Sequence, residues 1–191
     1  MSKRIKEIIT NGVFRENVAY VQLLGLCPLL AVSNTIANAI GLAAASSFVL
    51  IMSSLLVSIF RRFIVANYRL PTFVLIVGSM TSVVTLLMEA FTFPLYARVA
   101  LFVQIIVTNC MILGRIETIS SKANVTNSLF DAIATSLGFA LALITLGGIR
   151  ETLGYFVPLA SRPAGSFIVA GILLASGKYL VSQFRKSQLY E

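Results

Sequence analysis

The 191-residue sequence contains no histidine and no tryptophan, only two cysteines, and only 12% charged residues. A soluble domain typically carries about 25% charged residues, so this deficit is typical of a membrane protein. Without histidine, the chain has no imidazole to bind a metal or to act as an acid–base catalyst. Without tryptophan, the aromatic belt at the membrane interface must consist of tyrosine and phenylalanine.

Long apolar runs make up much of the remaining sequence, which is 58% hydrophobic with a mean hydropathy of +0.92. An apolar helix of about 20 residues crosses the ~30 Å hydrocarbon core of a bilayer. We therefore predict an all-α integral membrane protein with six transmembrane helices in a single membrane domain, residues 1–191. The expected spans are 14–33, 41–60, 71–92, 97–115, 128–149 and 164–183.

Lysine and arginine residues are distributed unevenly between the two sides of these spans. If the N-terminus is cytoplasmic, twelve lie on the cytoplasmic side and only Arg98, Arg150 and Arg162 lie on the other. The positive-inside rule therefore predicts that both termini are cytoplasmic. The same rule accounts for the net charge of +8, so the basic residues do not indicate nucleic acid binding.

The two halves of the chain show a weak internal similarity. Val21-Gln22 precedes Cys27 much as Val103-Gln104 precedes Cys110. The next helix of each half carries small residues at four-residue spacing, which favours close helix packing. These are Ala39, Ala43 and Ser47 in one half, and Ala134, Gly138 and Ala142 in the other. We predict two inverted three-helix repeats, approximately 14–92 and 97–183, with the first helix of each broken near its cysteine.

Cys27 lies where the first predicted helix should break. Pro28 has no N–H and its ring clashes with the preceding turn, and Gly25 lies two residues before the cysteine. Because proline is favoured in the first turn of a helix, Cys27 is expected at the start of a new half-helix. The backbone of Gly25, Leu26 and Pro28 would then surround the cysteine.

Cys110 has a comparable setting, because Thr108 and Asn109 precede it and asparagine is a good N-cap. A helix N-terminus stabilises a thiolate, the form of cysteine that binds metal. Both cysteines are thus candidate metal ligands. An isolated cysteine in an apolar helix is more often a small hydrophobic residue, and a disulfide is the other alternative. Two thiolates do not complete a four-cysteine site, so two further ligands would come from another chain.

Asp131 and Glu89 are acidic residues within the predicted spans. Intramembrane acids are candidates for ion or proton handling. For Asp131 the alternative is a dipole partner in the first turn of a helix, and Glu89 is close enough to a span end to reach the interface. Arg150 and Glu151 at the end of the fifth span are interpreted as interface anchors or as an inter-subunit pair.

The sequences around both cysteines, residues 23–32 and 106–110, resemble the E-subunit family of the Rnf electron transport complex. The related D subunit of the sodium-pumping NADH:quinone reductase, Nqr, is similar. Residues 177–180 and the pair Arg150-Glu151 also fit, so the resemblance covers nearly the whole chain. The stretch between Gly154 and Pro163 looks shorter than in many relatives.

The resemblance implies a multi-pass subunit of the bacterial inner membrane, paired with the homologous subunit Rnf A. Each of the two would contribute two cysteines to one shared [2Fe–2S] cluster, and the Rnf B, C, D and G subunits would complete the complex. The implied reaction couples ferredoxin and NAD to Na⁺ or H⁺ movement, with this chain carrying electrons and not catalytic alone.

Several alternatives remain open at the sequence level. Two cysteines per chain also fit a single iron held by four thiolates. The chain is alternatively the corresponding D subunit of Nqr, a small inverted-repeat secondary transporter, or a metal-free scaffold subunit.

Overall fold

The computed structural model describes residues 19, 21–33, 35–64, 68–156 and 165–175. Within this part of the chain there are helices and no strands, so the predicted all-α class is confirmed. The helices are α2 (Leu26–Val32), α3 (Ile36–Phe60), α4 (Arg69–Phe91), α5 (Phe93–Ile105), η3 (Ile106–Thr108), α6 (Cys110–Arg115), η4 (Ile116–Ser120) and α7 (Val125–Phe156). A further apolar helix covers Gly165–Ala175.

Four apolar helical stretches are long enough to cross a membrane: Ile36–Phe60, Arg69–Phe91, Tyr96–Ser120 and Val125–Gly154. They correspond to the second, third, fourth and fifth predicted spans. The first and last predicted spans, 14–33 and 164–183, lie partly outside the described residues. In the described part they contain the seven-residue α2 and the helix Gly165–Ala175.

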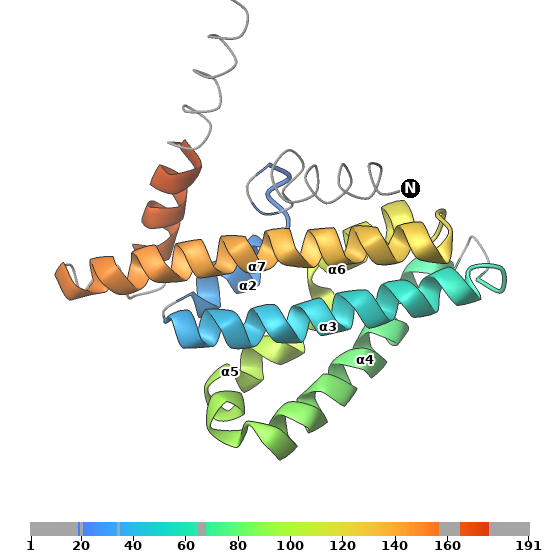
Figure 1. The fold of residues 1–191 in the computed structure, drawn as a ribbon, viewed down its shortest axis with the longest axis horizontal. Helices are drawn as coiled ribbons and strands as arrows, with labels where there is room; N and C mark the ends of the chain where they lie inside the picture. Colours follow the sequence, from blue (N-terminus) through green and yellow to red (C-terminus); the bar gives the residue numbers. More distant parts are fainter. Residues whose placement is uncertain (1–18, 20, 34, 65–67, 157–164, 176–191) are drawn as a thin grey trace, which may run out of the picture.

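The two longest helices, α3 and α7, run alongside each other and form the centre of the structure (Figure 1). Their pairing is antiparallel, because Gly147 near the end of α7 approaches Ala39 near the start of α3. A Cβ on Gly147 would lie 3.2 Å from the Cβ of Ala39. Ala39, Ala43, Ala134 and Ala142 are all buried, so the small residues at four-residue spacing lie in the core.

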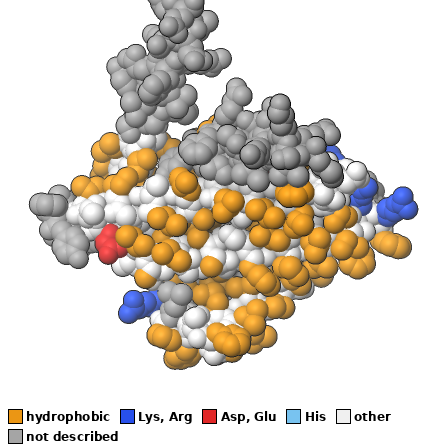
Figure 2. Space-filling model, viewed as in Figure 1, with side chains coloured by type: hydrophobic (Ala, Val, Ile, Leu, Met, Phe, Trp, Pro, Cys, Tyr) orange, Lys and Arg blue, Asp and Glu red, His pale blue; other side chains and the backbone are white. Residues whose placement is uncertain are grey.

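Helices α4 and α5 lie on one side of this central pair (Figure 1). Much of α4 is exposed within this chain, including Leu75, Leu86 and Phe91 at 70%, 67% and 83%. Figure 2 shows many hydrophobic side chains on the described part of the visible face, with basic side chains at the end where α3 finishes and α7 begins and also at the lower left. An apolar outer surface of this kind is what lipid or another membrane subunit covers.

Candidate metal centre

Cys27 lies in the first turn of α2, immediately after an irregular stretch of backbone. Gly25 caps this helix in the left-handed conformation with φ of 75°, and Leu23 is also left-handed with φ of 56°. A non-glycine residue in this region costs about 1–2 kcal/mol, and such strain tends to concentrate at functional sites. The Cys27 side chain is exposed, so it points out of this chain.

Cys110 is the first residue of α6, and its surroundings also interrupt the regular helix. α5 ends at Ile105, a short 3₁₀ turn follows, and Asn109 is extended with ψ of 116°. The Asn109 side-chain oxygen accepts a hydrogen bond of 3.0 Å from the N–H of Met111 and so caps α6. The Cys110 side chain, like that of Cys27, is a free thiol on the surface of the chain.

A hydrogen bond joins the two cysteine segments, although they lie 85 residues apart in sequence. The N–H of Gly25 donates to Sγ of Cys110 at 3.0 Å. Cys27 follows Gly25 by two residues, which span at most about 7 Å. The main-chain nitrogen of Cys27 therefore lies within about 10 Å of the Cys110 sulfur.

Gly25 is the point at which the Cys27 segment packs against the Cys110 segment. A Cβ at this position would lie 3.1 Å from the Phe139 ring, 3.2 Å from Cβ of Met111 and 3.3 Å from Oδ1 of Asn109. Glycine adopts the left-handed conformation without strain, and because it has no side chain it leaves room for this close approach. The sequence indicated Gly25 as a helix breaker, but it did not identify Gly25 as the residue that contacts the Cys110 segment.

The contact with Phe139 fixes the level of the cysteine segments along the molecule. Phe139 lies close to the middle of α7, which begins at Val125 and ends at Phe156. If α7 crosses a bilayer, the two cysteines are therefore near its mid-depth. Irregular backbone at that depth is tolerated where protein covers it or where it lines a cavity.

The described residues of this chain do not by themselves provide a complete set of metal ligands. Among the described residues, no three histidine, cysteine, aspartate or glutamate side chains come together. Asn109 is 3% exposed, and its Nδ2 has no hydrogen-bond partner in the described part of the chain. Two exposed thiols beside a buried, unsatisfied amide donor fit a group that is completed from outside this chain.

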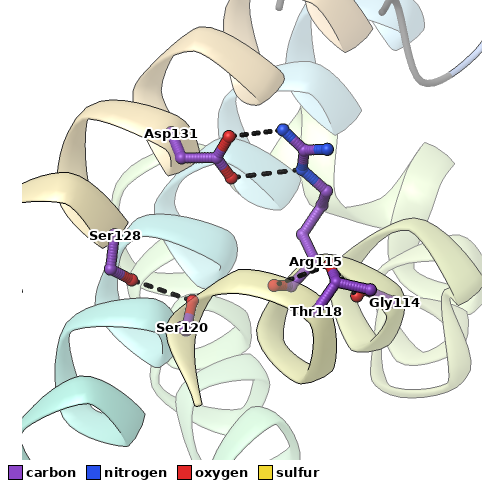
Figure 3. Close-up of polar contacts among 6 residues, drawn as sticks. All are labelled: Gly114, Arg115, Thr118, Ser120, Ser128 and Asp131. Atoms are coloured by element: carbon purple, nitrogen blue, oxygen red, sulfur yellow. Dashed lines mark hydrogen bonds and ion pairs between the residues drawn. The ribbon is translucent and has the colours of Figure 1, made fainter. Parts of the chain in front are cut away.

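Asp131 lies in an ion pair that the sequence did not predict. Its two carboxylate oxygens accept hydrogen bonds from Nε and an Nη of Arg115, with Nε to Oδ2 at 3.1 Å (Figure 3). Arg115 is in the last turn of α6 and is only 8% exposed. The pair thus attaches the Cys110 helix to α7, and Asp131 is engaged in a bidentate contact. Glu89, the other predicted acid, is exposed near the end of α4.

We expect Asp131→Asn to lower the midpoint of thermal unfolding of the purified subunit or complex. Removing one partner of a buried ion pair costs about 3–5 kcal/mol, and the partial exposure of this pair favours the lower end. The double variant Arg115→Gln, Asp131→Asn removes both charges and should recover part of the loss. Ion transport abolished by Asp131→Asn without any change in the unfolding midpoint would contradict this structural role.

Arg150 and Glu151 also differ from their sequence-based interpretation. Both make hydrogen bonds inside this chain, Arg150 to the C-terminal end of α2 and Glu151 to the first residue of α3. The interpretation as interface anchors or an inter-subunit pair missed these contacts, because their partners lie 115 to 120 residues away.

The described fold and site define a class of protein: a helical membrane protein with two free thiols at the starts of neighbouring helices. The family described as "Rnf-Nqr subunit, membrane protein" matches residues 5–184. The chain belongs to this Rnf-Nqr family, which confirms the resemblance noted in the sequence.

Individual relatives are named as the E subunit of an ion-translocating oxidoreductase complex. The protein of Pasteurella multocida is 48% identical over 210 residues, covering 95% of this chain and 93% of the relative. That of Pseudomonas paraeruginosa is 41% identical over 198 residues, covering 90% and 83%. That of Haemophilus ducreyi is 45% identical over 149 residues, covering 78% of this chain and 66% of the relative.

The extent of these matches differs between relatives. The chain spans about two thirds of the Haemophilus ducreyi protein, but nearly all of the Pasteurella multocida protein. The Pasteurella alignment of 210 residues is longer than this 191-residue chain, so the relative contains residues that this chain lacks. The predicted short stretch between Gly154 and Pro163 lies mostly outside the described residues.

Proposed function

We propose that this chain is a membrane core subunit of an ion-translocating ferredoxin:NAD oxidoreductase complex of the Rnf type. It carries electrons through an iron–sulfur cluster shared with a homologous subunit. The observation that carries this proposal is the hydrogen bond from Gly25 N–H to Cys110 Sγ, which brings the two segments with exposed cysteines together near the middle of α7. Relatives named as E subunits of ion-translocating oxidoreductase complexes support the assignment.

The incomplete donor set supports a partner chain. Cys27 and Cys110 supply two thiolates, and iron–sulfur clusters are typically held by four. Since both side chains are exposed, the remaining two ligands come from a chain that covers this face. We take this chain to be Rnf A, with the Rnf B, C, D and G subunits completing the complex.

The residues around the cysteines have identifiable roles in holding such a cluster. Cys27 and Cys110 lie in the first turns of α2 and α6, where the positive ends of the helix dipoles would favour the negative charge of a bound cluster. The Gly25 N–H stabilises negative charge on the Cys110 sulfur, and hydrogen bonds to sulfur are one factor that sets cluster potentials. A bound [2Fe–2S] cluster supplies one-electron transfer; a mononuclear iron with four thiolates would do the same.

The arrangement also supports inverted repeats at 14–92 and 97–183. Each cysteine helix, α2 or α6, precedes one of the two long helices, α3 or α7, and these two are antiparallel. We further propose that both termini are cytoplasmic, in the inner membrane of a bacterium. The basic residues gathered where α3 ends and α7 begins would then face the cytoplasm (Figure 2).

Two rival functions are separable from this one. The D subunit of Nqr belongs to the same family and would differ in the electron donor and acceptor of the whole complex. A secondary transporter would need an ion pathway through this chain, yet Asp131 is held by Arg115 and Glu89 is exposed on α4. Substrate-linked flux in liposomes that contain this chain alone would favour the transporter.

The first experiment is an assay of iron and acid-labile sulfide, with EPR, on the chain co-purified anaerobically with its homologous partner. We expect two iron and two sulfide per pair of subunits. One iron without sulfide would support the mononuclear alternative. Absence of iron from the intact pair would exclude the cluster and favour the transporter or the scaffold.

A further inference from the structure

A buried arginine on α7 holds the far end of the helix that carries Cys27. Arg150 is 1% exposed, and its Nη1 donates to the carbonyl oxygen of Leu30 at 3.0 Å and to Oγ of Ser33 at 2.8 Å. Ser33 is the C-cap of α2, and Leu30 lies in its last turn. The guanidinium therefore binds the C-terminal end of α2, where main-chain carbonyls lack helical partners.

The neighbouring residue of α7 binds the start of the next helix. Oε2 of Glu151 accepts a hydrogen bond of 2.8 Å from the N–H of Ile36, the first residue of α3. One turn earlier, Gly147 allows the close approach of Ala39. Consecutive residues of α7 thus place a cation at the end of α2 and an anion at the start of α3, and each charge matches the helix dipole it meets.

This contact matters because α2 has little stability of its own. Its seven residues are far fewer than the roughly 12–15 that an isolated helix needs to be marginally stable. Tertiary contacts therefore fix its position. Cys27 precedes Leu30 by three residues, about 4.5 Å along the helix axis, so the guanidinium lies at the opposite end of the same short helix.

We propose that Arg150 is a positioning residue for the metal centre at Cys27, and that its buried charge raises the reduction potential of that centre. The inference rests on the proposed function. Uptake of one electron makes the centre more negative by one charge, and a nearby cation in a medium of low dielectric constant stabilises that reduced state. Arginine keeps its charge when buried, which makes the effect permanent. The next residue, Glu151, carries a negative charge and therefore lowers the reduction potential.

The test is an EPR-monitored redox titration of the complex with its homologous partner, with dithionite as the reductant. We expect Arg150→Gln to lower the midpoint potential by at least the equivalent of a tenfold change in the ratio of reduced to oxidised centre, which is 59 mV for one electron. Glu151→Gln should raise the potential, and Arg150→Lys should stay nearer the wild type. Arg98→Gln removes the same charge at an exposed position of α5 and should leave the potential unchanged.

The opposite directions of the two expected potential shifts separate an electrostatic effect from general damage. Weakening the contact between α7 and α2 would shift the potential of both variants in one direction, or would lose iron in both. If Arg150→Gln does not assemble, the upward shift in Glu151→Gln still decides the matter. Wild-type complex without iron would refute the proposed function. Wild-type iron content with an unchanged potential in Arg150→Gln or Glu151→Gln would overturn the proposed role of Arg150 and would leave the proposed function standing.

Discussion

Replacing Cys27 or Cys110 with serine is expected to remove iron from the complex and to lower its electron transfer by more than about 100-fold. Even the outer-shell partners of metal ligands typically contribute about 10- to 100-fold to affinity or activity, and a direct ligand should contribute more. The measurement is iron content together with electron transfer by the assembled complex. Serine differs from cysteine by one atom, so assembly should be retained.

The two cysteine variants provide a comparison with each other. In Cys110→Ser the hydroxyl oxygen still accepts from the N–H of Gly25, so the two segments stay together without the metal. Ser79→Ala is a matched control, because this exposed hydroxyl donates to the carbonyl oxygen of Leu75 in its own helix. Electron transfer that persists at the wild-type rate in either cysteine variant would show that the chain is a scaffold.

Gly25→Ala is expected to reduce the iron content of the complex and its unfolding midpoint together. The methyl group meets Phe139, Met111 and Asn109 at 3.1–3.3 Å, and the left-handed conformation adds about 1–3 kcal/mol of strain. The closed arrangement of the two cysteine segments should become disfavoured by roughly tenfold or more. The readouts are iron and sulfide per complex and the thermal midpoint.

A glycine in open space gives the control for this change. Gly171 lies in the helix Gly165–Ala175, and a Cβ there would meet nothing within 4 Å. Alanine at this position should be neutral or should stabilise the helix by about 0.5–1 kcal/mol. If Gly25→Ala retains full iron and the wild-type midpoint, the close packing around Gly25 is unimportant for the site.

Local chemistry explains which features could be predicted from the sequence. The long apolar runs of α3, α4 and α7 made these helices predictable, although α7 extends beyond the expected 128–149 at both ends. The types of residue beside the cysteines also indicated where α2 and α6 begin. Asn109 caps α6, and Pro28 lies in the first turn of α2, as these residue types favour.

The contacts that assemble the site depend on distant residues and were not predictable from one sequence. The positive-inside argument assigned Arg115 and Arg150 to the two sides of the membrane, yet both are buried and hydrogen-bonded within the chain. Their partners, Asp131 and the end of α2, are 16 and about 120 residues away. No local pattern distinguishes a buried arginine from one at the membrane surface.

The length of α7 has a consequence for the choice of lipid. Its apolar stretch Val125–Gly154 has 30 residues and so measures about 45 Å, whereas a typical hydrocarbon core is about 30 Å thick. The helix must therefore tilt, or carry its ends into the headgroup layers. Because α7 binds both cysteine helices, its tilt moves them with it. Bilayer thickness, and hence acyl chain length, therefore acts on the orientation of the two thiols relative to the membrane.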